Sequence, residues 1–239
     1  MNKVAIIIAG GSGMGADSAK KLFSKGFKVS ILSSSGKGEK LAKKLKGIGY
    51  TGSNLLNKDL KKIVDLTIKK WGRVDVLVNS AGHGPKKPIL ELTDEDWLKG
   101  LDVYLMNVVR ASRLVTPIMK KQKSGVIINI STFSALEPDP ISPTSGPFRA
   151  GLANFTKLFA DKYASHNIRM NNILPGMIDS MTKEQKKKFN FDKFLHRIPL
   201  KRFGKLNEIS EVVCFLASDG AAYITGQNIR VDGGLTKSI

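Results

Sequence analysis

A glycine-rich stretch near the N-terminus is the first part of this sequence that could do chemistry. It lies between an apolar run, residues 4–9, and a segment with helical periodicity, residues 16–25. Glycines at a strand-to-helix junction let a phosphate approach the backbone, and the helix N-terminus favours its negative charge. The stretch predicts a site for the pyrophosphate of a dinucleotide, with a plain tight turn as the alternative. Its residues are Gly10, Gly11, Ser12, Gly13, Met14 and Gly15.

Three further side chains stand out by type and position. His83 follows a polar turn and titrates near neutrality, so it is either a proton donor or an ordinary surface histidine. Ser145 precedes Gly146 and Pro147, which is typical of a helix N-cap. Arg149 then falls in the first turn of that helix, where the dipole disfavours a cation. We therefore expect an anion or a ribose to hold Arg149.

The elements that must position these residues alternate between strand and helix. Apolar runs without alternation predict strands that are covered on both faces. Strand–helix alternation of this kind predicts an α/β fold, a doubly wound parallel sheet in a single domain over residues 1–239. The expected strands are 4–9, 28–32, 48–51, 74–79, 126–130, 168–174 and 228–231. The expected helices are 16–25, 37–46, 59–71, one from Thr93 to about 121, 147–165 and 208–217.

Composition narrows the class of protein. The chain has 239 residues, with 41% hydrophobic and 25% charged, which fits one globular domain. No apolar run approaches the roughly 18 residues that span a bilayer, so no membrane association is expected. The single cysteine, Cys214, excludes an internal disulfide framework and a multi-cysteine metal site. It lies in an apolar segment and is expected in the core. We expect a cytoplasmic protein without a bound metal.

The charge balance is unusual for such a chain. There are 39 Lys and Arg against 20 Asp and Glu, a net charge of +19. The lysines are scattered over segments with helical periodicity, as on a solvated outer face, and none of the basic runs interleaves with aromatic residues. A solvated basic surface is therefore the first interpretation. An acidic partner, such as an acyl carrier protein or a polyanion, is the second. No nucleic-acid partner is expected.

Short motifs at the ends of the predicted strands complete the pattern. They are Asn79-Ser80-Ala81-Gly82, Asn129-Ile130-Ser131-Thr132, the run 171–180 and Val231-Asp232-Gly233-Gly234. In this order and spacing the chain resembles the short-chain dehydrogenase/reductase family over essentially its whole length, close to its 3-oxoacyl-carrier-protein reductase-like members. The resemblance implies a Rossmann domain, a nicotinamide cofactor and commonly a homotetramer. Beyond the glycine loop it places Ser33, Ser34, Asn54, Asn79, Ala81, Gly82, Arg149, Pro175, Gly176 and Ile178 at the cofactor.

The end of the second predicted strand bears on the choice between NAD and NADP. A carboxylate there usually binds the ribose 2′-OH of NAD. Here the chain reads Ser33-Ser34-Ser35-Gly36-Lys37, with hydroxyls and a cation but no acid. Asn54 stands where relatives often carry an Asp. We expect NADP rather than NAD, with NAD still possible. Ala9 replaces the first glycine of the family motif, so the loop could differ locally.

The family's catalytic Asn, Ser, Tyr and Lys are all replaced. By motif they correspond to Tyr104, Thr132, Ser145 and Arg149. A serine hydroxyl is too weak an acid to take over from the tyrosine. If the chain is an enzyme, the useful proton donors are Tyr104 and His83, and we favour Tyr104. The resemblance then implies that Arg149 stabilises the phenolate and holds the cofactor ribose, and that Thr132 orients the substrate oxygen.

Two functions remain open at this point. The first is an NAD(P)-dependent oxidoreductase that moves a hydride between nicotinamide and a carbonyl or alcohol substrate, possibly bound to a carrier protein. The second is a catalytically inactive dinucleotide-binding sensor or partner subunit. Residues 180–199 are polar, basic and aromatic and are expected to form a substrate lid. Leu152, Phe155, Leu158 and Phe159 recur at helical spacing and serve either the core or a homotetramer interface.

Overall fold

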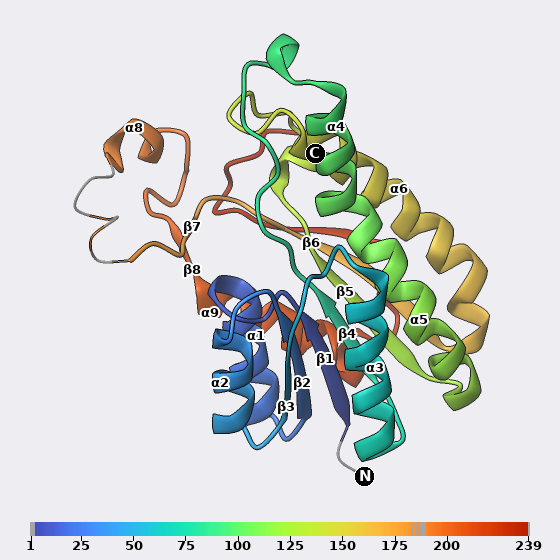
Figure 1. Ribbon diagram of the computed structural model, residues 1–239. Helices are drawn as coiled ribbons and strands as arrows, with labels where there is room; N and C mark the ends of the chain where they lie inside the picture. The colour runs from blue at the N-terminus through green and yellow to red at the C-terminus, as the bar shows by residue number, and fades with distance from the viewer. Residues whose placement is uncertain (1–2, 183, 185, 187–189, 239) are drawn as a thin grey trace.

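A parallel sheet of seven strands forms the centre of the computed structural model, which describes residues 3–182, 184, 186 and 190–238 (Figure 1). The strand order is β3-β2-β1-β4-β5-β6-β9. Successive strands are added on one side of β1 up to β3 and then on the other side from β4 onward, so the order of addition reverses between β1 and β4. Ligands of doubly wound sheets bind outside the carboxyl ends of the strands at such a reversal. The predicted fold class is confirmed. The strands are β1 (Val4–Ile8), β2 (Lys28–Ser33), β3 (Ile48–Thr51), β4 (Val76–Asn79), β5 (Gly125–Ile130), β6 (Ile168–Pro175) and β9 (Asn228–Val231).

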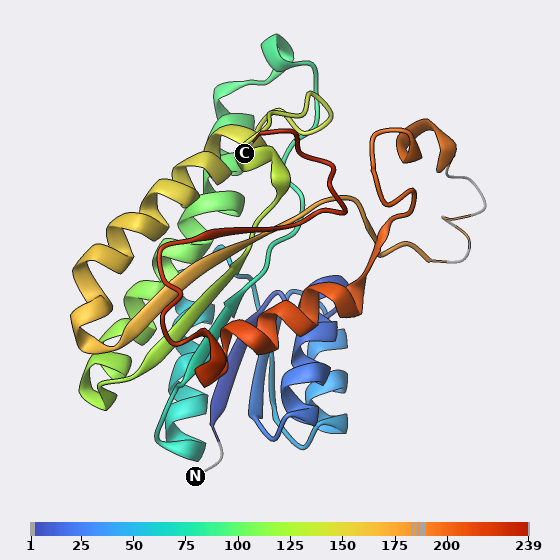
Figure 2. The ribbon, with the colours of Figure 1, turned by 180° about the vertical axis from the view of Figure 1, so that it is seen from behind.

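Helices cover both faces of the sheet, and Figure 2 shows the second face from behind. On one face α1 (Gly13–Ser24), α2 (Lys37–Lys44) and α9 (Leu206–Leu216) bury a cluster that includes Leu22 and Ile209. On the other, α3 (Asn57–Trp71), α5 (Asn107–Gln122) and α6 (Ser145–Tyr163) bury Leu60, Val115 and Phe159. Cys214 packs in the first cluster as predicted, and burial raises the pKa of its thiol to about 11.

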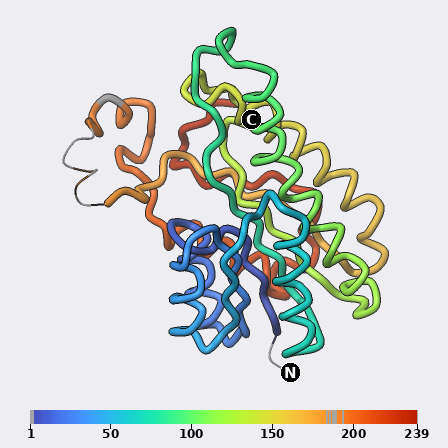
Figure 3. Tube along the Cα trace, in the orientation of Figure 1, coloured from blue at the N-terminus to red at the C-terminus, as the bar shows by residue number. Residues whose placement is uncertain are grey.

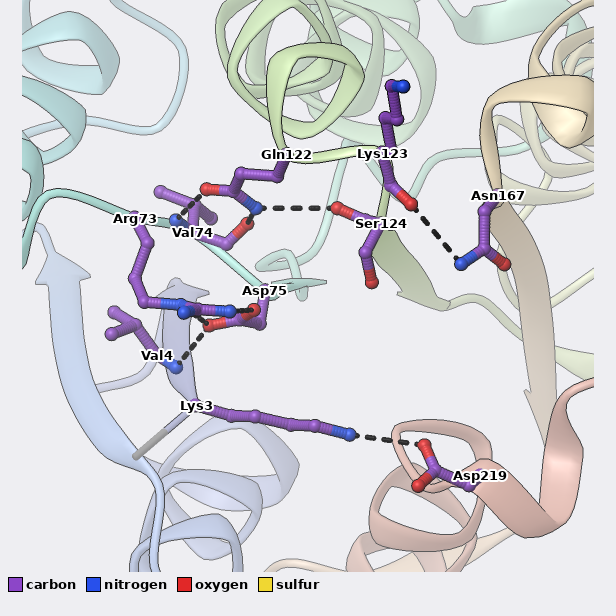
Figure 4. Close-up of polar contacts among 10 residues, drawn as sticks. All are labelled: Lys3, Val4, Arg73, Val74, Asp75, Gln122, Lys123, Ser124, Asn167 and Asp219. Atoms are coloured by element: carbon purple, nitrogen blue, oxygen red, sulfur yellow. Dashed lines mark hydrogen bonds and ion pairs between the residues drawn. The ribbon is translucent and has the colours of Figure 1, made fainter. Parts of the chain in front are cut away.

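The amino ends of the central strands are closed by internal polar contacts (Figure 4). The carboxylate of Asp75 accepts the N–H of Val4 at 2.8 Å and pairs with Arg73, whose Nε and Nη2 lie 2.8 and 2.6 Å away. The side-chain amide of Gln122 bonds both backbone groups of Val74, at 3.0 and 2.8 Å. These contacts hold the amino ends of the strands together, whereas the loops at the carboxyl ends leave room for a ligand.

A row of four asparagines crosses the sheet in register. Asn79, Asn129, Asn172 and Asn228 are cross-strand partners on β4, β5, β6 and β9. Each amide nitrogen donates to the next amide oxygen, at 2.9, 2.9 and 2.8 Å. Thr156 of α6 donates to Asn172 at 2.9 Å. Buried amides of this kind must be paired, so the row ties four strands and one helix together.

The helix expected from Thr93 to about 121 is continuous but not uniform. Thr93 caps it as predicted, with its Oγ1 accepting the N–H of Asp96 at 3.2 Å in a capping box. The chain runs through α4 (Asp94–Leu101), a π-helical turn η2 (Asp102–Met106) and then α5. π-Turns inside α-helices occur frequently at functional sites. This one holds Tyr104.

The remaining elements are short. A two-stranded parallel sheet joins β7 (Ile178–Asp179) to β8 (Gly204–Lys205), and between them the segment with α8 (Asp192–Leu195) projects beside the main sheet (Figure 3). Neither this sheet nor α8 was predicted. Residues 183, 185 and 187–189 of the expected lid lie outside the described residues, so the lid stays a prediction. The 3₁₀ turns are η1 (Ile89–Glu91), η3 (Phe133–Ala135), η4 (Ala164–His166) and η5 (Asp219–Ala221).

Ala9, which replaces the first glycine of the loop, has a left-handed backbone with φ of 56°. An L-residue pays roughly 1–2 kcal/mol for this conformation, and glycine pays little. The expected local difference in the loop is thus backbone strain at Ala9.

We predict that Ala9→Gly raises the stability of the protein by about 0.5–1 kcal/mol, because relief of strain outweighs the extra freedom of the unfolded chain. Thermal unfolding should shift upward by roughly 1–4 °C. The matched control is Ala153→Gly within α6, where glycine should cost about 1 kcal/mol. Destabilisation by both substitutions would show that Ala9 is not strained.

Candidate active site

A cavity of about 510 Å³ lies at the carboxyl ends of β4, β5 and β6. Residues from separate parts of the sequence line it. All five predicted catalytic residues border this cavity: His83, Tyr104, Thr132, Ser145 and Arg149. Arg149 was also predicted at the cofactor, and six more of the predicted cofactor positions border the cavity: Met14, Ala81, Gly82, Pro175, Gly176 and Ile178. The fold therefore collects these residues in one place.

Tyr104 is held in the cavity wall by its π-turn and by a backbone contact. The side chain is 4% exposed, and its Oη accepts the N–H of Gly84 at 2.6 Å. A Cβ at Gly84 would lie 2.6 Å from Cε2 of the ring, so only glycine permits this close approach. The phenol acts as acceptor in this bond and keeps its own proton available. Donation from an N–H group also stabilises a phenolate.

Arg149 lies against the ring of Tyr104. Its guanidinium carbon is 5.1 Å from the ring centroid, a cation–π arrangement. The residue is 5% exposed and makes no hydrogen bond or ion pair with the residues that the structure describes, and its Nε is buried without a partner. Burial lowers the pKa of Arg149 to about 10, and Tyr104 acts in the opposite direction. Arg149 is thus a charged donor at neutral pH whose bonding capacity is unused.

The hypothesis that Ser145 is the N-cap of α6 is wrong. Ser145 is the first helical residue, Thr144 occupies the cap position, and neither side chain makes a cap bond. The cause is the preceding turn, in which the N–H of Ser145 bonds the carbonyl of Ser142 at 2.9 Å. Arg149 consequently lies one turn inside the helix, not in its first turn. Ser145 is buried, and its hydroxyl is on the cavity wall.

Thr132 follows the end of β5 by two residues, borders the cavity and is partly exposed. Its Oγ1 accepts a long bond from the N–H of Ser134 at 3.4 Å. That weak contact leaves the Thr132 hydroxyl proton available to an oxygen in the cavity. Asn107, which shares the helix with Tyr104, turns away and donates to the carbonyl of Ser80 at 3.4 Å.

His83 is an exposed residue at the rim of the cavity. Desolvation of the ring lowers its pKa, and Lys86 lowers it further. A lowered pKa favours the uncharged ring, which is the weaker proton donor. This observation favours Tyr104 over His83 as the acid.

The glycine loop presents a helix N-terminus to solvent. α1 begins at Gly13, and Ser12 at its cap position makes no side-chain bond. A Cβ at Gly15 would lie 2.8 Å from the carbonyl oxygen of Ala9, so this position requires glycine. A groove of about 370 Å³ beside the loop is lined by four lysines, Lys20, Lys37, Lys40 and Lys44. Free N–H groups and lysines together suit a phosphate.

The other predicted cofactor residues divide into two groups. Ser34 is exposed and Asn54 is partly exposed, at the ends of β2 and β3. Ser33 is buried, donates to the carbonyl of Ser35 at 2.5 Å and accepts the N–H of Gly38 at 3.2 Å. Asn79 is buried in the asparagine row. The hydroxyl of Ser33 is engaged within the protein, as is the amide nitrogen of Asn79, whereas Oδ1 of Asn79 is buried without a partner among the described residues.

Sequence reasoning missed several members of the cavity wall. Phe194 and Phe203 come from the segment between β7 and β8, and Asp139 comes from the loop before α6. The aromatic character of residues 180–199 was a signal for this wall. Nothing in the sequence around Asp139 distinguished it from a surface acid.

Comparison with known proteins decides the family. The family model described as Enoyl-(Acyl carrier protein) reductase matches residues 8–236. The chain belongs to the short-chain dehydrogenase/reductase family. It is 34% identical over 242 residues to the 3-oxoacyl-[acyl-carrier-protein] reductase FabG of Staphylococcus epidermidis, covering 98% of this chain and 99% of that protein. It is 38% identical over 183 residues to the FabG of Thermotoga maritima, covering 76% and 74%.

Solved structures of this family superpose closely on the chain. YwfH, an NADPH-dependent reductase involved in bacilysin biosynthesis, matches over 100% of both chains with a TM-score of 0.94 and 28% identity. A short-chain alcohol dehydrogenase of Sinorhizobium meliloti matches with a TM-score of 0.90 and 27% identity, over 100% of this chain and 98% of that one. The chain is accordingly an NAD(P)-dependent oxidoreductase that moves a hydride between nicotinamide and a carbonyl or alcohol.

Two features are lacking in the described part of the chain. No helix there has the length and apolar character needed to cross a membrane. No group of three or more His, Cys, Asp or Glu side chains there could hold a metal ion.

Proposed function

We propose that this protein is an NADPH-dependent carbonyl reductase in which Tyr104, and not the residue at the usual tyrosine position, donates the proton. The observation that carries the proposal is the Tyr104–Arg149 pair in the wall of the 510 Å³ cavity. A phenol with its proton free, an N–H bond to its oxygen and a cation over its ring has the parts of a general acid.

The residues present fit a dinucleotide. Gly15 permits the tight turn of the glycine loop, α1 offers an uncapped N-terminus, and Arg149 in the cavity has a buried Nε without a partner among the described residues. Gly10 to Gly15 would hold the pyrophosphate, Ser34 and Asn54 the adenosine end, and Ala81, Gly82, Pro175, Gly176 and Ile178 the nicotinamide end. NADPH, when bound, supplies the hydride.

This chain's own residues complete the reduction. The hydroxyl of Thr132 donates a hydrogen bond to the carbonyl oxygen and orients it, and Thr132 keeps its proton. Tyr104 transfers its phenolic proton to that oxygen as the alcohol forms. The N–H of Gly84 and the guanidinium of Arg149 stabilise the resulting phenolate. Ser145 lines the cavity and does not act as the proton donor.

Steady-state oxidation of NADPH over a panel of ketones and aldehydes tests the proposal. Turnover of at least one carbonyl class is expected. Tight NADPH binding without turnover of any member would contradict it and favour the dinucleotide-binding sensor or partner subunit.

The preference for NADP over NAD is a separate prediction about the end of β2. Exposed Ser34 and Lys37 offer a hydroxyl and a cation to a 2′-phosphate, and no carboxylate lies in the run 33–37. We expect NADPH to bind at least tenfold more tightly than NADH, about 1.4 kcal/mol, by calorimetry. Lys37→Glu should weaken NADPH about tenfold and NADH less than threefold.

The matched control for Lys37→Glu is Lys28→Glu, an equal change in charge at the start of β2, the opposite end of the strand. It should leave both affinities within twofold. Binding of NADH at least tenfold tighter than NADPH in the unmodified protein would overturn the preference.

A homotetramer is also part of the proposal. A groove of about 590 Å³ between α5 and α6 is lined by Phe155, Phe159 and Tyr163, and Leu158 of α6 is 63% exposed. Exposed apolar side chains gathered on one face of a helix support an interface there. Leu152, by contrast, is fully buried and serves the core.

Light scattering at micromolar concentration should give the mass of a tetramer, and Leu158→Glu should reduce that mass. Leu90→Glu is the control, because Leu90 is 96% exposed on η1, away from this groove. A monomeric mass for the unmodified protein would contradict the assembly.

Cellular location and closure of the site complete the proposal. Cytoplasmic location is supported by the single cysteine, which is free and buried. A lid over residues 180–199 is supported by Ser180, Met181 and Phe194, all of which border the cavity.

A further inference from the structure

We infer that Arg149 binds a carboxylate of the substrate, so that the natural substrate is a carbonyl compound that also carries a carboxylate group. The inference rests on the proposed function and adds the chemical class of the molecule that is reduced. It follows from a charge in the cavity wall that nothing in the described chain neutralises.

Arg149 is 5% exposed and makes no hydrogen bond or ion pair with the described residues. Its Nε is buried without an acceptor, and the charge-related contact that the described chain gives it is the ring of Tyr104 at 5.1 Å. A buried cation destabilises the protein unless an anion pairs with it. A cation–π contact offsets only part of that cost.

The acids around the cavity do not supply the missing charge. Among the described residues that line it, Asp139 is the only acid. Its Oδ1 accepts the N–H of Ile141 at 3.0 Å, and its Oδ2 pairs with Arg197 at 3.5 Å. Lys86 adds a second positive charge at the rim. The cavity therefore has an excess of positive charge over the acids that are free to pair.

The phosphates of a dinucleotide have a different place in the molecule. Gly11, Ser12 and Gly13 of the glycine loop line the other groove together with Lys37, and Met14 is the residue of this loop that borders the cavity. A ribose next to Arg149 would accept hydrogen bonds but would bring no negative charge. An anionic group on the substrate would accept hydrogen bonds from the guanidinium and would also neutralise its charge.

The chemistry of the wall also sets where the carbonyl lies. A guanidinium binds a carboxylate through two parallel N–H···O bonds, which fixes the orientation of the bound molecule. Tyr104 and Thr132 border the same cavity and remain available to the carbonyl oxygen. Small 2-oxo and 3-oxo acids place the two groups close enough to share this wall.

The test compares matched pairs that differ only in charge: a 2-oxo acid and its ethyl ester, and a 3-oxo acid with its ethyl ester and its N-acetylcysteamine thioester. With NADPH, the unmodified protein should prefer at least one acid over its ester by 30-fold or more in kcat/KM. In Arg149→Met this ratio should fall below threefold, whatever the loss in absolute rate. Lys86→Ala, which removes the other cation, should keep the ratio within threefold of the unmodified protein.

A binding measurement covers the case in which Arg149→Met folds poorly or turnover is slow. Oxamate, a carboxylate without a reducible ketone, is titrated into the NADPH complex by calorimetry. It should bind the unmodified protein at least tenfold more tightly than the folded Arg149→Lys protein, which keeps the charge but loses the paired N–H donors.

The outcomes separate the inference from the proposed function. Reduction of esters or thioesters as efficiently as acids overturns the carboxylate anchor and leaves the reductase intact. Equal oxamate binding by the two proteins overturns the anchor as well. Absence of NADPH oxidation with every carbonyl contradicts the reductase, while the oxamate titration still decides the anchor.

Discussion

Replacement of Tyr104 with phenylalanine is expected to lower kcat by about 10²–10⁴-fold, the range that general acid catalysis contributes. The substitution removes the phenolic proton and the acceptor of the Gly84 N–H, while the ring beside Arg149 stays in place. NADPH affinity, measured by calorimetry, should stay within about twofold, because no dinucleotide contact is assigned to Tyr104.

Tyr223→Phe is the matched control for this loss. Tyr223 is fully exposed at 103%, so its hydroxyl should be irrelevant to turnover. Full activity of Tyr104→Phe together with loss of activity in His83→Ala would move the acid to His83. That outcome would require a charged imidazole, although its surroundings lower the pKa of His83.

Replacement of Asn129 with leucine is expected to destabilise the fold by about 2–4 kcal/mol. Asn129 is fully buried, accepts from Asn79 at 2.9 Å and donates to Asn172 at 2.9 Å. Leucine would leave the amide of Asn79 buried without an acceptor, and an unpaired buried polar group costs roughly 1–3 kcal/mol. Lost contacts to Thr156 add to this.

Urea unfolding at one fixed protein concentration measures this loss, since assembly affects apparent stability. Asn57→Leu is the control, at an exposed position at the start of α3, and should change stability by less than about 0.5 kcal/mol. Equal stability of the two variants would show that the asparagine row contributes little to the fold.

Most of the sheet was predictable because its strands are buried on both faces. The buried strands β1, β2, β5 and β6 each differ from the predicted range by one residue at one end. A continuous apolar run flanked by glycines specifies such a strand without help from the rest of the chain. The helices were equally well marked, since Trp71 is followed by Gly72 in a left-handed conformation.

The departures lie where tertiary contacts decide the local structure. The π-turn around Tyr104 has no signature in hydrophobic periodicity, because it depends on how one helix passes the end of the sheet. The sheet of β7 and β8 pairs residues far apart in the sequence, at Ile178 and Gly204. The Ser-Gly-Pro pattern at Ser145 indicated a helix cap. In the structure the N–H of Ser145 already donates to the carbonyl of Ser142 in the preceding turn, and Ser145 is the first residue of the helix.

The candidate site was predictable in its members and not in its contacts. Family motifs located Tyr104, Thr132 and Arg149, and the fold brings them to one cavity. The stacking of Arg149 on Tyr104 and its unpartnered Nε depend on side-chain packing between α6 and η2. No spacing in the sequence records that packing, so the unneutralised charge emerged only from the structure.

Isotope transfer tests the central claim, that this chain reduces carbonyl compounds with a hydride from NADPH. NADPH that carries two deuterium atoms at C4 of the nicotinamide is incubated with the protein and the carbonyl panel. The masses of the products are then measured by mass spectrometry. An alcohol one mass unit heavier, with the deuterium on the former carbonyl carbon, is the predicted result. Bound but unoxidised NADPH with every carbonyl, and no deuterium in any product, would contradict the account.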